Sequence, residues 1–514
     1  MCIVIFVLCL AVFDLFVGVS NDAVNFLQSA VGARVASFRT VLIIASVGVL
    51  LGTVMSSGMM DVARHVIMVP SHYTFHEVMT IFLAVMVTDV IVLDMFNTLG
   101  MPTSTTVSLV FELLGGTVML ATLKLAADHN LDMSSLVNSS KALQVIIAIF
   151  VSVAISFVVG MVVMWISRVV FTFNYQKHSK WSIAIFGGIA FTTLAYFIFI
   201  QGMGKSPYIP SAVRDYIKDN TNMLLGATFV VSTIMMEVLH LVKVNIFKFV
   251  VLMGTFALAM AFASNDLVNF IGVPLAGLDS YRDFQANANG QGADQYLMVS
   301  LMSSARTPLY YLMTAGFIMI LAMATSKKAQ NVIKTSVDLS RQDEGDEMFG
   351  SSMAARSIVR FCQSAVVWTA HLFPLRLRQW VNSRFNANEV ELTDDRAAFD
   401  VVRAAVNLVI ASMLIVFGTN HQLPLSTTYV TFMVAMGSSL ADRAWSRESA
   451  VFRVTGVLSV IGGWFITAGV AFIFCAVNCL LMWYGGFFVQ FAYMVLVVYL
   501  LWRSNRQYKR KLQQ

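Results

Sequence analysis

The sequence has few charged residues for its length. Asp, Glu, Lys and Arg make up 12% of the 514 residues, whereas a soluble domain normally carries about 25%. A water-soluble protein of this size could not cover its surface with so few charges, which excludes a soluble enzyme, a nucleic-acid-binding protein and a disordered scaffold. The net charge of +6 does not restore a nucleic-acid partner, because membrane proteins hold excess Lys and Arg on their cytoplasmic face.

Cysteine is also scarce, and the five residues show no spacing typical of a disulfide framework or a metal site. Cys475 and Cys479 lie one helical turn apart in an apolar run, where we expect them to pack as small apolar side chains. The apolar start at 1–10 has no basic residue before it and no small-residue cleavage site after it. We interpret it as the beginning of a membrane helix, not as a signal peptide.

Long apolar runs fill most of the chain, and 58% of the residues are hydrophobic. The runs are continuous and not alternating, so they predict helices and not strands. A helix needs about 20 apolar residues to span a bilayer, and on this basis we predict an all-α polytopic membrane protein with about twelve membrane segments. The candidate segments are 1–20, 40–60, 78–98, 105–127, 143–170, 181–201, 223–240, 245–263, 296–325, 401–418, 451–483 and 486–502.

Two short polar motifs occur twice, in the same order in each half of the chain. Ser20–Phe26 reads Ser-Asn-Asp-Ala-Val-Asn-Phe and recurs at Ser264–Phe270 with six of seven residues identical. Pro102–Thr106 reads Pro-Thr-Ser-Thr-Thr and recurs at Pro424–Thr428 with four of five residues identical. Chance would rarely place two ordered polar pairs inside membrane segments, so we interpret the chain as an internal duplication.

This duplication predicts how the chain is divided. One long polar stretch interrupts the second half, and its Lys and Arg content indicates the cytoplasmic side. Within it, 354–380 is either an amphipathic helix at the membrane surface or a solvated loop. The predicted parts are a first transport repeat (1–170), connecting membrane helices (171–244), the first part of a second repeat (245–325), the cytoplasmic insert (326–400), the second part of the second repeat (401–502) and a basic tail (503–514).

The first motif places an acid, Asp22 or Asp266, at bilayer depth with no Lys or Arg within one helical turn. An ionised Asp there costs about 2.5–3.5 kcal/mol and needs a cation, a proton or a hydrogen-bond donor. Carboxylate and amide oxygens suit Na⁺ or a proton. The alternative is that these side chains only join helices to one another, but the duplication favours a cation site. The predicted cation-binding residues are Asn21, Asp22, Asn25, Asn265, Asp266 and Asn269, with sodium at Asp22 and Asp266.

The second motif is typical of a helix that begins inside the membrane. Pro suits the first turn of a helix, where no N–H partner is needed, and the free N–H groups of a helix start bind oxyanions well. Transporters use such broken helices to bind anions near the midplane. The alternative is a Pro kink healed by hydroxyl groups. The predicted substrate-binding residues are Ser104, Thr105, Thr106, Ser426, Thr427 and Thr428.

The two kinds of site are opposite in sign. A polyvalent anion cannot lie beside Asp22 and Asp266 unless cations lie between, so together the motifs predict cation-coupled anion transport. Two Asp residues suggest two coupling ions.

At these residues the chain resembles the inorganic phosphate transporter family, the sodium- or proton-coupled phosphate permeases. That family carries Gly-Ala-Asn-Asp-Val-Ala-Asn near the start of each half and Pro-x-Ser-Thr-Thr-His later in each half. These correspond here to the motifs that begin at Ser20 and Pro102 and to their copies at Ser264 and Pro424. The resemblance implies two inverted repeats with broken or re-entrant helices, and phosphate and cations bound between the halves.

The chain departs from the family pattern at several positions. Ser20 and Ser264 replace a small Ala or Gly, and Val107 and Tyr429 stand where the family has His. Val49 stands where sodium-coupled members have Glu. These departures indicate a divergent branch.

Three further acids lie in apolar runs near the first Pro-Thr-Ser-Thr-Thr motif. Asp89 and Asp94 either join a proton or cation path or mark a helix end near the membrane interface. Glu112, two turns after Ser104, is ambiguous in the same way.

We therefore predict a symporter that carries inorganic phosphate with sodium, with protons as the second choice, and no enzymatic activity. The transported ions are the only cofactors expected, and the expected partners are phosphate, the coupling cation, the lipid bilayer of the cell membrane and a second copy of the chain. A sulfate permease is the nearest alternative. A passive anion channel and an intramembrane hydrolase are weaker ones, the latter because catalysis does not require Ser20 and its neighbours twice.

Overall fold

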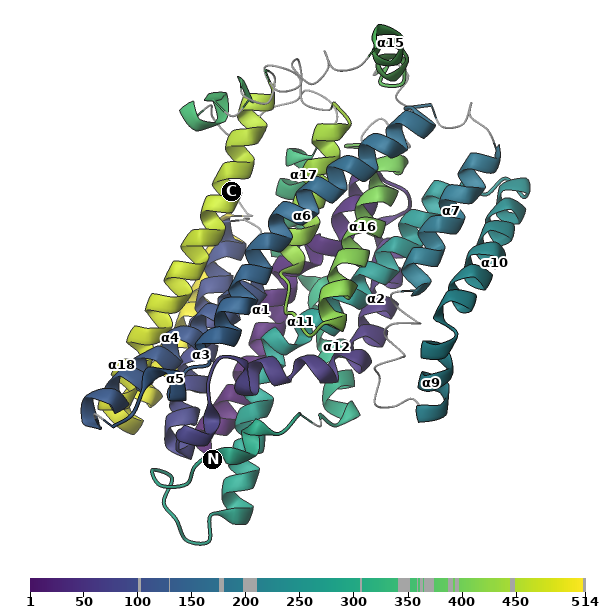
Figure 1. Cartoon of the computed structure of the whole chain (residues 1–514). Helices are drawn as coiled ribbons and strands as arrows, with labels where there is room; N and C mark the ends of the chain where they lie inside the picture. The colour runs from purple at the N-terminus through teal and green to yellow at the C-terminus, as the bar shows by residue number, and fades with distance from the viewer. Residues whose placement is uncertain are drawn as a thin grey trace.

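The protein is described from a computed structural model, which covers residues 1–99, 103–128, 130–174, 180–196, 210–305, 307–340, 352–357, 359–360, 364, 374–386, 392, 397–443 and 449–511. Over these residues the chain is a bundle of helices with no β-strand (Figure 1). This confirms the all-α prediction. Pro102 of the second motif lies outside the described residues.

The helices of the bundle are joined mostly by short turns. In chain order they are α1 (Cys2–Gly32), α2 (Phe38–Met55), η1 (Ser56–Met59), η2 (Val62–Val66), η3 (Pro70–His72), α3 (Phe75–Leu99), α4 (Thr105–Ala127), α5 (Met133–Leu136), α6 (Ser139–Phe171), α7 (Lys180–Ala195), α9 (Ser211–Asp219), α10 (Thr221–Leu241), α11 (Ile246–Asn287), η6 (Val299–Met302), α12 (Leu309–Thr325), α13 (Lys327–Leu339), α15 (Leu375–Ser383), α16 (Val401–Asn420), α17 (Thr427–Ala441) and α18 (Ser449–Lys511).

Two long helices, α1 and α11, pack against each other in the middle of the bundle (Figure 1). The helix α3 packs on α1, and α16 packs on α11. Their partners α4 and α17 reach the opposite central helix, α4 contacting α11 and α17 contacting α1. Outside these, α18 covers α4 and α6 covers α17.

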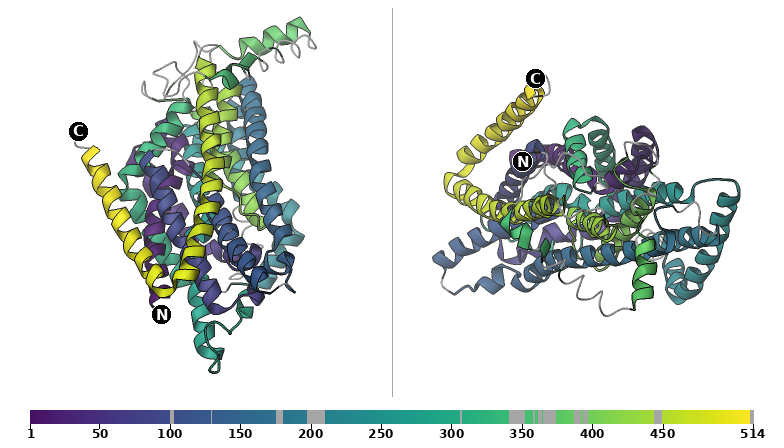
Figure 2. Two further views of the ribbon diagram at one scale, coloured as in Figure 1. Left: turned by 90° about the vertical axis from the view of Figure 1, so that its left-hand side faces the viewer. Right: turned by 90° about the horizontal axis from the view of Figure 1, so that it is seen from above.

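Nine helices within the described ranges are long and apolar enough to cross a membrane. A tenth span results if α12 and α13, which meet at a bend of 70°, are counted together. The prediction of about twelve segments divided the C-terminal run into two spans, 451–483 and 486–502, whereas the nine helices include it as one. At about 1.5 Å per residue, the apolar part of α18 is far longer than the bilayer core of about 30 Å. Gly486, whose φ of 53° favours glycine, bends this helix back on itself (Figure 2).

The helix α13 begins the polar stretch predicted as a cytoplasmic insert, and it lies against α1. Ser20 donates to Ser326 at 2.7 Å, and Ser336 donates to Gln28 further along the same two helices. The apolar face of α13, including Val332 and Ile333, is buried. The start of the polar stretch is thus part of the packed bundle.

A buried network of four charged residues ties together the ends of α6, α16 and α17. Arg168 on α6 reaches both Asp400 and Asp442, with nitrogen–oxygen distances of 2.8 Å to each. Arg403 binds Asp442 at 3.0 Å through Nε. All four side chains are completely buried. Because Asp400 caps the start of α16 and Asp442 follows the end of α17, the network fixes these helix ends relative to α6.

Candidate functional site

The two copies of the first motif lie in the middle of α1 and α11. Their Asn and Asp side chains are buried, with exposed fractions from 0% to 2%. Asn and Asp are weak helix formers because they compete for backbone hydrogen bonds. The helices continue through both motifs because these side chains find their partners on other helices.

The two copies of the second motif begin helices, as the sequence predicted. Ser104 precedes α4 and accepts a hydrogen bond from the backbone N–H of Val107 at 3.1 Å. Ser426 precedes α17 and accepts one from Tyr429 at 3.1 Å. Both serines are therefore N-caps, and the threonines that follow each serine occupy the first turn of the helix.

Asp22 lies between the two helix starts. Thr105 of α4 donates to Oδ2 of Asp22 at 2.8 Å, and Thr428 of α17 donates to Oδ1 at 3.3 Å. One carboxylate of the first half thus joins both halves of the chain.

Asp266 makes the matching contacts with the other two threonines. Thr427 donates to Oδ2 of Asp266, and Thr106 donates to Oδ1 at 3.3 Å. The amide of Asn265 adds a donor at 2.6 Å. The four threonine hydroxyls at the two helix starts are therefore shared between the two acids.

The second Asn of each motif crosses to the opposite half. Asn25 on α1 donates to Thr427 and Thr428 at 3.0 and 3.1 Å. Asn269 on α11 donates to the two threonines at the start of α4, at 3.0 Å each. The carbonyl oxygen of Asn269 is buried without a hydrogen-bond partner among the described residues. It is an open acceptor inside the site.

Asn97 is a site residue that sequence reasoning missed. It lies near the end of α3, accepts from Asn21 at 2.8 Å and donates to the backbone of Val17 at 2.6 Å. Asn21 in turn accepts from the backbone N–H of Thr103 at 3.0 Å. Asn97 therefore ties α3 to the first motif, and Asn21 ties the motif to the residue before Ser104.

Thr419 takes the same position in the second half. It donates to Asn265 at 3.1 Å, and Asn265 donates to the backbone carbonyl of Leu425 at 2.8 Å. Asn97 and Thr419 each stand five residues before the Pro of the second motif. Extending the repeat upstream would have found the pair, but the two residues differ in type, so a search for identity passed over them.

Among the described residues, no basic side chain hydrogen-bonds to either of the two acids. In the part of the chain that the structure describes, the hydrogen-bond partners of Asp22 and Asp266 are all hydroxyl and amide groups. The acids also act on each other electrostatically. The twelve predicted site residues are thus brought together, with an excess of oxygen ligands and no fixed cation.

Two departures from the family pattern now have a location. Tyr429 is buried and stacks on Trp464 with ring centroids 3.9 Å apart. Its hydroxyl has no hydrogen-bond partner among the described residues. Val107, its counterpart on α4, is buried, and so is Val49 on α2. The positions where the family has polar residues are therefore filled here mostly by apolar packing.

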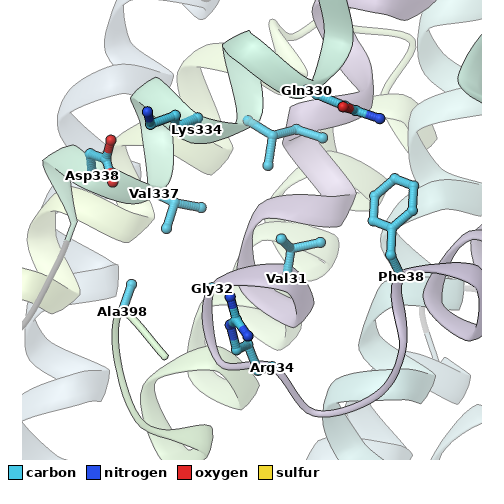
Figure 3. Close-up of a pocket in the computed structure, with 10 residues that line it drawn as sticks. Val31, Gly32, Arg34, Phe38, Gln330, Lys334, Val337, Asp338 and Ala398 are labelled. Carbon is cyan, nitrogen blue, oxygen red and sulfur yellow. The ribbon is translucent and has the colours of Figure 1, made fainter. Parts of the chain in front are cut away.

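A cavity of about 420 Å³ opens elsewhere, at the C-terminal end of α1 (Figure 3). Gly32 lies ten residues beyond Asp22 on the same helix, which corresponds to about 15 Å along the axis. None of the twelve predicted site residues lines it. The lining residues are Val31, Gly32, Arg34, Phe38, Gln330, Ile333, Lys334, Val337, Asp338 and Ala398.

Comparison with known proteins identifies the family of the chain. Residues 18–336 match the phosphate transporter family. A solved structure described as the sodium-dependent phosphate transporter shares the fold, with a TM-score of 0.66 and 16% identity over 94% of this chain and 99% of that chain. No curated protein matches the sequence. The match with the family covers more than half of the chain, including three of the four motif copies, and confirms the predicted resemblance. The chain is a multi-pass integral membrane protein that belongs to the phosphate transporter family, a family of transporters and not of enzymes.

Proposed function

We propose that the protein is a symporter that carries inorganic phosphate together with sodium across the cell membrane. The observation that carries the proposal is that two buried acids have no basic partner among the described residues and instead accept hydrogen bonds from four threonine hydroxyls at two helix starts. Phosphate alone would be repelled by Asp22 and Asp266. A cation at each acid removes this repulsion.

The same contacts supply a reason for coupling. As long as Asp22 is unbalanced, the hydroxyl of Thr105 points its proton at the carboxylate. A sodium ion on the carboxylate weakens that hydrogen bond, because the oxygen then shares its charge with the metal. The hydroxyl is then free to donate to a phosphate oxygen, beside the N–H groups of the helix start. Cation binding thereby prepares the anion site.

The site also supports two inverted repeats with about twelve membrane segments. Three kinds of contact in the first half have counterparts in the second: acid with threonine, Asn with the opposite helix start, and the upstream Asn97 or Thr419 with the first motif. Such exchange of contacts is what two related halves around one site would produce.

The decisive experiment is uptake of radiolabelled phosphate into proteoliposomes, with sodium and proton gradients imposed separately. A sodium gradient should drive phosphate above its external concentration, and a proton gradient alone should not. Accumulation driven only by a proton gradient would show that the coupling ion is the proton and not sodium. Flux that ignores both gradients would indicate a passive channel, and full competition by sulfate would indicate a broader oxyanion permease.

A further inference from the structure

A second group of acids is buried in the bundle, outside the site described above. Asp14 on α1, Asp89 on α3 and Glu112 on α4 have exposed fractions of 0%, 1% and 0%. All three side chains are therefore enclosed by neighbouring helices. We call these three residues the acid cluster.

The carboxylates of the acid cluster are poor in hydrogen bonds. Neither oxygen of Asp14 or of Asp89 accepts a hydrogen bond among the described residues when the acids are taken as ionised, although the Ser108 hydroxyl also lies near Asp89. Glu112 accepts one hydrogen bond, from Ser108 at 2.6 Å, and its other oxygen has none. Asp14 and Asp89 nevertheless lie within hydrogen-bonding reach of each other. Two ionised carboxylates cannot hydrogen-bond, because both only accept. One proton on either carboxylate makes it a donor to the other.

Among the residues that the structure describes, no neighbouring helix brings a compensating charge. Asp22 on α1 acts electrostatically on Asp14, Glu112 acts on the thiol of Cys475 on α18, and Asp266 on α11 acts on Asp22. On α13, which also packs on α1 and α3, Lys327 and Lys334 are exposed. Within the described ranges, no group of three acids, His or Cys is arranged to hold a metal ion. A buried, unpaired carboxylate pair is costly unless it neutralises by taking up a proton.

We propose that Asp14 and Asp89 share one proton beside Glu112, and that this proton leaves when a cation binds at Asp22. The exchange is balanced: one sodium ion enters at Asp22, one O–H bond of the acid cluster breaks, and the proton goes to water. The proton itself rests on the acid cluster alone, whereas its link to sodium rests on the proposed function.

The sign and size of the link follow from charge and distance. Asp14 is eight residues before Asp22 on one helix, which corresponds to about 12 Å. At an effective dielectric constant of about 20, two unit charges at this distance shift an equilibrium about tenfold. Sodium at Asp22 favours the ionised acid cluster, so by reciprocity a lower pH weakens sodium binding by up to about tenfold.

The proton is tested without sodium, by infrared spectroscopy of the purified full-length protein. When the spectrum of the Asp14→Asn/Asp89→Asn variant is subtracted from that of the wild type, the difference should contain the carbonyl band of a protonated carboxyl group. The matched control is Asp94→Asn, on the same helix α3 but outside the acid cluster, and it should keep the band. A wild-type spectrum without this band, or a double variant that retains it, would overturn the proposal. If the double variant does not fold, Asp89→Asn alone is measured.

The link is tested by adding sodium chloride, with choline chloride as the control, to weakly buffered protein containing a pH indicator. Binding of ²²Na⁺ is measured on the same samples. The wild type should release protons and bind sodium more tightly as pH rises, and the double variant should do neither. Sodium binding without proton release would overturn the link. Absence of sodium binding, or equal binding by Asp22→Asn, would instead contradict the proposed cation site, and the infrared result would still decide whether the proton is there.

Discussion

Two regions of this protein bury charged side chains, and they treat them in opposite ways. In the network at the ends of α6, α16 and α17, Arg168 and Arg403 face Asp400 and Asp442, and all four side chains are completely enclosed. In the middle of α1 and α11, two acids are equally buried, but their hydrogen-bond partners in the described part of the chain are hydroxyl and amide groups.

The difference separates structure from transport. A paired ion that is hydrogen-bonded on all sides has nothing left to bind, and removing one partner leaves an uncompensated charge in a medium of low dielectric constant. An acid without a fixed counter-ion keeps its charge for a mobile cation. The arginines could not serve at the central site, because a tethered cation would neutralise the acids permanently. The comparison predicts that the two regions respond differently to neutralisation.

The largest effect is expected for Asp22→Asn and for Asp266→Asn. Each variant should reduce sodium-driven phosphate uptake by about a hundredfold or more, because interactions with a charged group contribute up to about 3 kcal/mol. The fold should survive, since a neutral amide is cheaper to bury than an unpaired carboxylate. Uptake into proteoliposomes and the unfolding temperature in detergent are measured side by side.

The control for this pair is Asp94→Asn, which removes an acid of α3 that does not belong to the site and should leave uptake near the wild-type level. Sodium-dependent uptake by both Asp22→Asn and Asp266→Asn at the wild-type rate would contradict the assignment of the cation sites.

The converse effect is expected for Arg168→Met. Removal of this side chain leaves Asp400 and Asp442 with Arg403 as the one remaining guanidinium of the network. Breaking a buried pair in this way costs about 3–5 kcal/mol, so the unfolding temperature should fall strongly. Arg168→Lys keeps the charge but loses the planar guanidinium group, so its unfolding temperature should fall by less. An Arg168→Met protein that unfolds at the wild-type temperature would remove the distinction between the two regions.

The sequence was enough to predict the central site but not the ion network. The repeat identified the motif residues, because each polar pattern occurs twice inside apolar runs. All twelve residues lie together in the structure, on or just before α1, α4, α11 and α17. Arg168 gives no such signal, because one Arg near the end of an apolar helix is typical of a membrane interface. Its partners follow in sequence only after more than two hundred residues, and such a pairing depends on how the helices pack.

The helix count shows a different limit. The predicted division of the C-terminal run, into 451–483 and 486–502, agrees with the bend of α18 at Gly486. By contrast, α17 was not among the candidate segments because it has only 15 residues, although it is buried in the bundle.

A smaller effect sharpens the comparison within the central site itself. Asn25→Ala and Asn269→Ala each remove one amide that donates to two threonines of the opposite half. Loss of such hydrogen bonds costs about 1 kcal/mol, so each variant should raise the KM for phosphate about fivefold, and by similar factors. Asn407→Ala, which removes an amide of α16 bound to Ser438 outside the site, is the control. An effect confined to one of the two variants would show that the halves are not equivalent.

The smallest effect is expected for the contribution of Asp400 to stability, which should not change between pH 7 and pH 5. Burial disfavours the Asp400 carboxylate, yet Arg168 and Arg403 hold its pKa below the usual range. An acid with a lowered pKa stabilises the fold fully above its unfolded value of about 4 and loses this contribution only as the pH falls further. The difference in unfolding temperature between the wild type and Asp400→Asn in detergent should therefore stay constant from pH 7 to pH 5 and shrink below pH 4. Over the same range of pH 7 to 5, sodium binding should weaken as the acid cluster gains its proton. A network that weakened together with sodium binding would mean that the paired charges titrate as the unpaired ones do, and that pairing is not what separates them.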